Sequence, residues 1–261
     1  MKIDREKYIS HIQDNDRVIE MRQILDKIEI VMNKHMVEST DFLDPYSRLL
    51  AKSIMDQFLE IDYLEQGGLK ESERQTIIIY PDYYYLDDED LNIVGLRLRG
   101  KFENLSHRDF LGSILGLGIN RSKIGDILLH EEFTDIIVKR EIANFIEFNL
   151  EKVGNNKISI EEVKLQDLIP GETAYKEIVK TLSSNRLDVY ISGAYNLSRG
   201  DSTKLISAGN VKVNWEPIDK TSKELEVGDI ISIRGYGRSI FHSIEGLSRK
   251  DKIRSIIRIL I

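Results

Sequence analysis

The spacing of the apolar residues changes along this chain, and that change limits the possible folds more than any other feature. Between residues 17 and 61, apolar residues recur at three- and four-residue steps, which is typical of amphipathic helices. Asp44 followed by Pro45 is a typical helix start, and Gly67 and Gly68 end this region. Later runs such as TIIIY (76–80) and LNIVGLRLRG (91–100) are β-branched or alternating, which indicates strands. We therefore expect an α+β protein.

The order of these elements divides the chain into three units and a tail. Residues 1–72 predict a helical N-terminal domain. Residues 73–170 predict the order β-β-α-β-β-α-β, and so a central split-βαβ sheet domain like that of an RNA-recognition motif, with helices on one face. Residues 181–247 predict a small αα-β domain, and residues 248–261 a basic C-terminal tail.

Composition excludes several classes of protein. The chain has no cysteine, which rules out disulfides and thiolate chemistry, and no apolar run approaches the roughly 20 residues of a membrane-spanning helix. The N-terminus has no apolar signal core, so we expect a cytoplasmic protein. The net charge is −7, yet residues 181–261 carry 13 Lys and Arg against 9 Asp and Glu. This asymmetry favours an anionic partner at the C-terminal end.

The stretch from residue 186 to 215 contains two short helical patterns followed by an alternating strand. Ser198 is placed to cap the second helix, and Gly209 to end it. Val211, Val213 and Trp215 then alternate with Lys212 and Asn214. Guanidinium groups and helix N-termini both bind phosphate oxygens. The candidate RNA-binding residues are therefore Arg186, Ser198, Arg199, Lys204, Lys212, Asn214, Arg234 and Arg238, although the periodicity alone favours a small domain with ordinary surface charges.

Two motifs in the central region imitate enzyme signatures. His107-Arg108-Asp109 looks like a kinase catalytic-loop triplet, but the other kinase motifs are missing and a Ser106…Asp109 capping box explains the aspartate. GLGIN (116–120) closes a predicted helix instead of opening one, so it does not indicate a nucleotide loop. A second phosphate-binding edge and solvated surface charge are equally compatible with four residues around this helix, namely His107, Arg108, Arg121 and Lys123.

Neither a metal site nor a cofactor is expected, and we predict no catalytic residue. The five histidines show no paired spacing, and there is no cysteine to complete a zinc site. No Gly-rich loop follows a first strand, as a methyl-donor or dinucleotide site would require.

The stretch from residue 186 to 234 resembles the small RNA-binding domain named for ribosomal protein S4. The matching positions are Arg186-Leu187-Asp188, Leu197-Ser198-Arg199, Leu205-Ile206, Gly209, Val211, Val213-Asn214 and Gly228-Asp229. The resemblance implies a module that binds structured RNA through its backbone and shape, with Arg186, Arg199 and Lys204 as contacts and Asp188 in a structural role. Gly200 and Asp201 follow Arg199 where related modules often carry more cations.

The whole chain is similar to the YlmH-type proteins of Gram-positive bacteria. The similarity rests on SHRDFLGSILGLGINRSKIGDI (106–127), on the helical region before it and on a C-terminal module that contains RGYGR (234–238). It implies a central RNA-binding domain and a non-enzymatic factor that acts on ribosomes in rescue of stalled nascent chains held on transfer RNA. The expected partners are ribosomal RNA, the large ribosomal subunit and transfer RNA, with no DNA and no membrane span.

Two other functions remain open from the sequence. The same module is often attached to pseudouridine synthases and ribosomal RNA methyltransferases, so an RNA-modifying enzyme is the alternative, and calorimetric binding of S-adenosylmethionine would support it. An adaptor whose acidic N-terminal region recruits a protein is compatible with RNA binding, and a pull-down that survives RNase would favour it.

Overall fold

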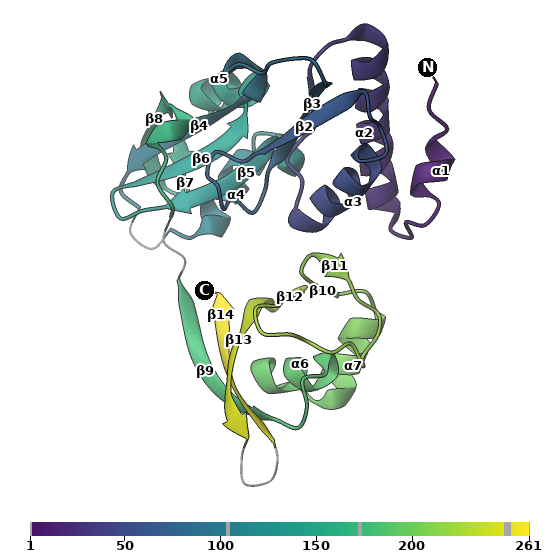
Figure 1. Cartoon of the computed structure of the whole chain (residues 1–261). Helices are drawn as coiled ribbons and strands as arrows, with labels where there is room; N and C mark the ends of the chain where they lie inside the picture. Colours follow the sequence, from purple (N-terminus) through teal and green to yellow (C-terminus); the bar gives the residue numbers. More distant parts are fainter. Residues whose placement is uncertain (1, 103–104, 172–173, 248–251, 261) are drawn as a thin grey trace. The chain divides into compact units, whose positions relative to one another are not determined.

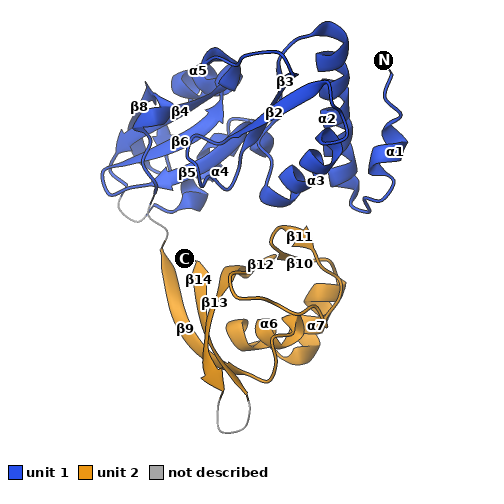
Figure 2. Ribbon diagram, viewed as in Figure 1, with its two compact units in different colours: residues 1–172 blue, residues 173–261 orange. Residues whose placement is uncertain are grey.

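The computed structural model describes residues 2–102, 105–171, 174–247 and 252–260. The chain forms two compact units, residues 1–172 and residues 173–261 (Figures 1 and 2). Each unit combines helices with antiparallel sheet, which confirms the α+β class. Among the described residues, no helix has both the length and the apolar character needed to cross a membrane.

The first unit begins with three helices around an apolar core. They are α1 (Arg5–Ile9), α2 (Asn15–Lys34) and α3 (Pro45–Met55). The Asp14 carboxylate caps α2 by accepting from the backbone N–H groups of residues 16 and 17, and Asp44 caps α3 by accepting from the Ser47 N–H at 2.9 Å. Pro45 lies at the start of α3, as predicted. The buried face of α2 is formed by Met21, Ile24, Leu25, Ile28 and Val31.

The N-terminal part is not purely helical, as predicted, but also contains a sheet. Strands β1 (Glu38–Ser39), β3 (Thr76–Pro81) and β2 (Ile61–Gln66) pair antiparallel in the order β1-β3-β2. TIIIY, which we had assigned to the central sheet, is β3, because its residues Ile77 and Ile79 bury themselves in the core beneath α2. The helical pattern predicts helix as far as residue 61, but α3 ends at Met55, and the chain continues as strand β2 from Ile61.

The central sheet has five strands with helices on one face (Figure 1). Its order is β5-β6-β4-β8-β7, formed by β5 (Ile124–Leu129), β6 (Phe133–Lys139), β4 (Ile93–Gly100), β8 (Asn156–Val163) and β7 (Lys152–Val153). Helix α4 (His107–Leu115) connects β4 to β5, and α5 (Arg140–Asn149) connects β6 to β7. Because β4 lies between β6 and β8, and every neighbouring pair is antiparallel, the split-βαβ prediction is confirmed. The short turns are η1 (Glu89–Leu91), η2 (Arg121–Lys123) and η3 (Leu165–Asp167).

Part of the other face of this sheet is covered by the N-terminal segment. Phe42 is fully buried there and packs with Ile137 and Leu168 in a small second core. Gly125 of β5 makes this contact close, since a Cβ atom at that position would lie 2.7 Å from the Phe42 ring. Glycine at residue 125 therefore lets the Phe42 ring lie directly on β5.

Lys139, the last residue of β6, is buried between the two sheets of the first unit. Its ammonium donates to Ser39 Oγ at 2.6 Å and to the Thr40 carbonyl at 3.1 Å, and only 2% of the residue is exposed. Burial lowers the pKa of Lys139 to about 8, although the carboxylate of Asp41 acts in the opposite direction.

We expect the stability of the first unit to rise with pH above about 8, because the folded protein then releases a proton that the unfolded chain keeps until about pH 10.4. Over that interval the gain attributable to Lys139 is about 3 kcal/mol. Urea denaturation between these pH values, in the natural chain and in Lys139→Met, measures it. Equal pH slopes in the two proteins would contradict the assignment, and Lys152→Met, an exposed lysine on β7, is the control.

The second unit is a six-stranded antiparallel sheet packed against two helices. The helices are α6 (Leu187–Tyr195) and α7 (Arg199–Ser207). The sheet order is β11-β10-β12-β13-β14-β9, formed by β11 (Glu216–Pro217), β10 (Val211–Val213), β12 (Ile230–Ile233), β13 (Gly237–Leu247), β14 (Ile253–Leu260) and β9 (Tyr175–Leu182). Tyr190, Ile206 and Phe241 are fully buried in its core.

The segment assigned to a basic tail is instead part of this sheet. Strand β14 lies between β13 and β9, with Ser255 and Ile257 fully buried. The inward positions of IRSIIRIL alternate with Arg254 and Arg258, and this period of two is typical of a strand, whereas the net charge of the segment does not reveal it. Residues 248–251 and 261 of the predicted tail lie outside the described residues. Strand β9 (Tyr175–Leu182) occupies most of the gap between the predicted domains 73–170 and 181–247, and residues 172 and 173 in that gap lie outside the described residues.

Candidate nucleic-acid interface

A buried carboxylate joins the beginnings of the two helices of the second unit. Asp188, in the first turn of α6, accepts from Arg186 Nε at 3.0 Å and from Arg199 Nη2 at 3.1 Å. Arg186 is the N-cap residue of α6, and Arg199 is the first residue of α7. The side chain of Asp188 is 7% exposed, whereas those of Arg186 and Arg199 are 41% and 63% exposed. Asp188 therefore orients two arginines whose outer parts reach solvent.

The charge state of Asp188 follows from these contacts. Burial alone would raise its pKa, but the hydrogen bonds and positive charges of Arg186 and Arg199 together outweigh burial and lower the pKa. The carboxylate is thus ionised at neutral pH. This arrangement agrees with the structural role that the resemblance implied for Asp188.

Two other predicted contact residues lie on α7. Ser198 is its N-cap, as predicted: the Asp201 N–H donates to Ser198 Oγ at 3.1 Å, and that hydroxyl donates to the Asp201 carboxylate at 2.7 Å. The structure thus explains Asp201, the acidic residue beside Arg199, as a capping residue. Lys204 lies one turn further on with 82% of its side chain exposed, 3.7 Å from Asp201. Ser198 has a structural role, and Lys204 is available to a ligand.

The predicted residues on the sheet fall into two groups. Lys212 on β10 and Arg238 on β13 are both in register with Ser232 on β12, so their side chains share the sheet face that points away from the helices. Asn214 is not in the strand: its backbone has φ 49°, and its amide donates to Asp229 at 2.7 Å. The Ile230 N–H donates to Asn214 Oδ1 at 2.9 Å, so Asn214 fixes a turn. Arg234 is exposed just after β12.

The second proposed phosphate surface, in the central sheet domain, is only partly assembled. His107 and Arg108 are exposed in the first turn of α4, where Ser106 and Asp109 form the predicted capping box. Lys123 instead bonds to Asp41 and to Glu141, each at 2.7 Å. Arg121 donates to the Ile124 and Gly125 carbonyls. Arg121 and Lys123 therefore make contacts within the protein, whereas His107 and Arg108 are exposed.

One polar cluster in the central sheet was only half recognised. The alternation of LNIVGLRLRG (91–100) predicts that Arg97 and Arg99 lie on one face of a strand, but it does not predict their partners. Arg97 makes a bidentate pair with the fully buried Asp135 at 2.7 and 2.8 Å, and its guanidinium carbon lies 4.0 Å from the ring centre of Phe133. The alternation of FTDIIVKR puts Phe133 and Asp135 on one face, but the register that brings them to Arg97 comes from strand pairing.

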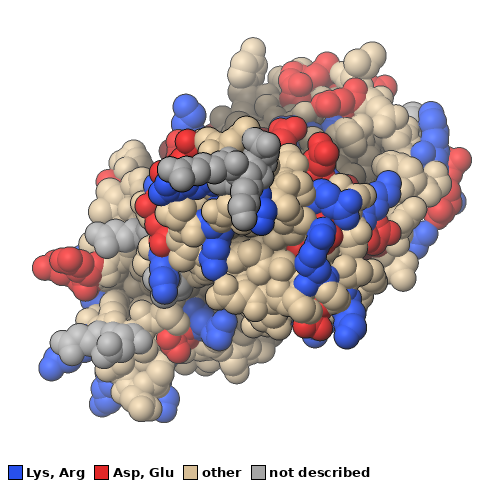
Figure 3. Space-filling view, turned by 90° about the horizontal axis from the view of Figure 1, so that it is seen from below, with Lys and Arg blue, Asp and Glu red and all other residues tan. Residues whose placement is uncertain are grey.

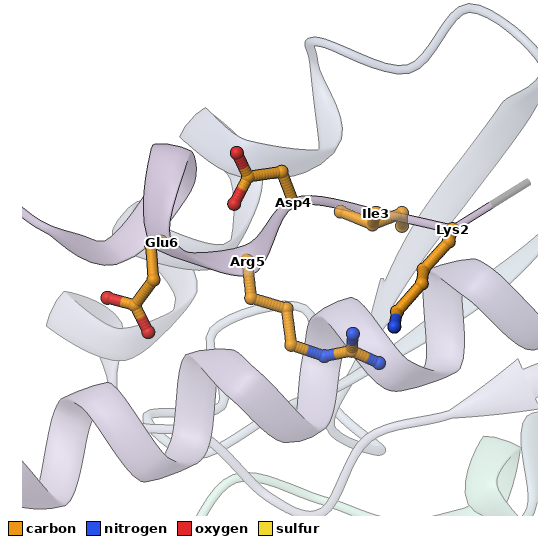
Figure 4. A pocket seen from close by; sticks show the side chains of 5 residues that line it. All are labelled: Lys2, Ile3, Asp4, Arg5 and Glu6. Carbon is orange, nitrogen blue, oxygen red and sulfur yellow. The ribbon is translucent and has the colours of Figure 1, made fainter.

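Surface charge and hollows add little to this picture. Figure 3 views the protein from below relative to Figure 1. Among the described residues visible there, Lys and Arg side chains form several groups that are separated by acidic and uncharged residues. A hollow at the N-terminus is lined by residues 2–6, and Figure 4 shows their side chains pointing in different directions. Arg5 in this hollow already pairs with Asp26 and with Glu29. Within the described ranges, no group of three or more His, Asp and Glu is arranged to hold a metal ion.

A helix pair on a small curved sheet, with arginines at the helix starts, defines an RNA-binding protein of the S4-domain class. Residues 185–231 match the family model of the S4 domain, residues 86–167 that of the RNA-binding domain in YlmH, and residues 16–84 that of the YlmH N-terminal domain. The chain is 32% identical over 246 residues to ribosome-associated protein quality control protein P2 of Bacillus subtilis (strain 168), covering 94% of this chain and 95% of that protein. The chain therefore belongs to the YlmH family.

A solved structure supports the same family. It is the cell division protein ylmH from Streptococcus pneumoniae, which matches with a TM-score of 0.52 and 26% sequence identity. The match covers 60% of this chain and 96% of that one.

Proposed function

We propose that this chain is a non-enzymatic, cytoplasmic factor that binds ribosomal RNA on the large ribosomal subunit, contacts transfer RNA there, and acts in rescue or quality control of stalled translation. The name of the Bacillus subtilis relative, ribosome-associated protein quality control protein P2, supports the ribosomal setting. The observation that carries RNA binding is the Asp188 cluster, in which one buried carboxylate orients two exposed guanidinium groups.

The cluster is suited to phosphate groups because each guanidinium has five N–H donors. Arg186 uses donors on Nε and Nη2 for Asp188, and Arg199 uses Nη2. Both keep further donors for a ligand. Fixing the side chains in advance reduces the entropy lost when they bind. Lys204, on the same helix as Arg199, extends the positive charge.

The test removes the two positive charges without leaving a buried carboxylate unpaired. The variant is Arg186→Gln with Asp188→Asn and Arg199→Gln, assayed by co-sedimentation with purified large ribosomal subunits over a range of salt concentrations. Because each lost phosphate contact lowers the slope of log K against log salt by about 1, we expect the slope to fall by about 2 and affinity to fall at every salt concentration.

The control variant is Glu6→Gln with Arg22→Gln, which removes an exposed ion pair of 2.7 Å in the first unit. It should sediment as the natural chain does. A triple variant that keeps the natural affinity and salt slope would refute the proposed interface.

A further inference from the structure

The single tryptophan of the chain occupies a backbone position that favours glycine. Val213 pairs with Glu216, so Asn214 and Trp215 are the two residues of the hairpin turn between β10 and β11. Both have positive φ, 49° and 66°, as in a type I′ turn. Glycine is preferred at the second position of such turns, because a Cβ atom makes this conformation unfavourable.

The turn itself does not explain the choice of tryptophan. The indole Nε1 of Trp215 is covered by protein, yet it donates to no acceptor in the described part of the chain. Trp215 is also not among the described residues that form or pack against the core of the second unit. A positive φ at a bulky residue destabilises the fold, and so does a buried N–H group without an acceptor. An observed backbone outlier of this kind is a reason to look for a function.

The partly exposed indole lies on a basic part of the sheet. The guanidinium carbon of Arg238 is 5.7 Å from its ring centre. Arg238 faces away from the helices, because the next residue, Ser239, points inward and accepts a hydrogen bond from Tyr190 of α6 at 3.0 Å. Lys212 lies on the same face, because Lys212 and Arg238 are both in register with Ser232. The indole therefore shares the open face with two cations.

We propose that Trp215 is a stacking platform for one unpaired RNA base, and that Arg238 and Lys212 bind the phosphates beside that base. Stacking on an aromatic ring suits any base, since every base has a π-face, and a neighbouring arginine strengthens such a site. The proposal rests on RNA binding by the second unit, but it uses residues on the sheet, whereas the Asp188 cluster lies at the helix starts. If both sites bind RNA, the interface recognises an unpaired nucleotide as well as the backbone of structured RNA.

The fluorescence of Trp215 tests this directly, because the full-length chain has only one tryptophan. The probes are a stem-loop RNA whose loop is unpaired adenosines and a blunt duplex of the same stem, both at low salt, with total binding followed by anisotropy of labelled RNA. Stacking should quench the indole when the stem-loop binds. The duplex should bind with little quenching.

Two variants separate stacking from folding. Trp215→Gly suits the turn, so it should unfold at an equal or higher urea concentration, yet it should bind the stem-loop about 5- to 150-fold more weakly. Trp215→Phe keeps an aromatic ring and should retain most of the affinity. The affinity of Trp215→Gly for the blunt duplex should stay unchanged.

The outcomes distinguish this inference from the proposed function. RNA binding without quenching, together with natural affinity in Trp215→Gly, would overturn the stacking site and leave the Asp188 interface standing. Quenching by proteins of RNase-treated large subunits, but not by RNA, would assign the indole to a protein contact and also overturn it. If the natural chain binds neither RNA nor large subunits, both proposals fail.

Discussion

Replacing Arg186 and Arg199 together with alanine is expected to lower the free energy of unfolding of the second unit. The reason is the carboxylate that remains: Asp188 is 5% exposed and would lose both of its positive partners. A buried charge without a partner costs more than the exposed ends of the two arginines contribute. Urea denaturation followed by circular dichroism measures the change.

The rescue variant adds Asp188→Asn to the two alanines and should recover most of the lost stability. The effect also depends on pH in a defined direction. Because the pKa of Asp188 is lowered in the folded protein, its contribution is present above the unfolded pKa of about 3.9 and is lost as the pH falls through the folded value. The stability difference between the natural chain and the double variant should therefore shrink below about pH 4. A difference that stays constant under acid conditions would argue against the ion pairs.

Replacing Arg97 with leucine is expected to destabilise the first unit by about 3 to 5 kcal/mol. Asp135 is completely buried, and its two oxygens accept from Arg97 at 2.8 and 2.7 Å, so the substitution leaves a buried, unpaired carboxylate. The variant also loses the contact between the Arg97 guanidinium and the ring of Phe133. Denaturation of the full-length chain, with a probe on the first unit, measures the loss.

The same strand offers a matched control. Arg99 lies on the same face of β4, but its side chain and that of its partner Glu161 are 49% and 55% exposed. Arg99→Leu should therefore cost less than about 1 kcal/mol. Adding Asp135→Leu to Arg97→Leu should restore part of the stability, because the buried charge is then gone. Similar losses for the Arg97 and Arg99 variants would show that burial of Asp135 does not set the size of the effect.

Local sequence patterns correctly predicted those structural features that depend on residues close together in the sequence. The caps at Asp44 and Ser198, the Ser106 capping box and the helix pair with its following strand all appear in the structure. These features need only residues within one turn of a helix. The split-βαβ sheet followed from the alternation of helix and strand, and family resemblance supported the RNA module.

Pairings between distant segments could not be read from the sequence. No local sequence pattern predicts that Lys123 forms an ion pair with Asp41, or that Arg97 forms one with Asp135 on the neighbouring strand. The same limit explains why TIIIY is wrongly assigned to the central sheet. Its partner strand β2 precedes it, in a region that the sequence predicts to be helical. Trp215 was placed in a strand because alternation continued through it, and two positive φ angles, which alternation cannot reveal, put it in a turn.

The position of β14 has a consequence for how the second unit is made. Among the described strands, β9 is hydrogen-bonded to β14 alone, and β14 is synthesised after every other described element of the unit. While the chain is being translated, β9 and β13 must both wait with an open edge until residues 253–260 leave the exit tunnel. Pairing between distant segments is slow, and open strand edges invite aggregation. The last strand thus sets the moment at which the sheet of the RNA-binding unit can close.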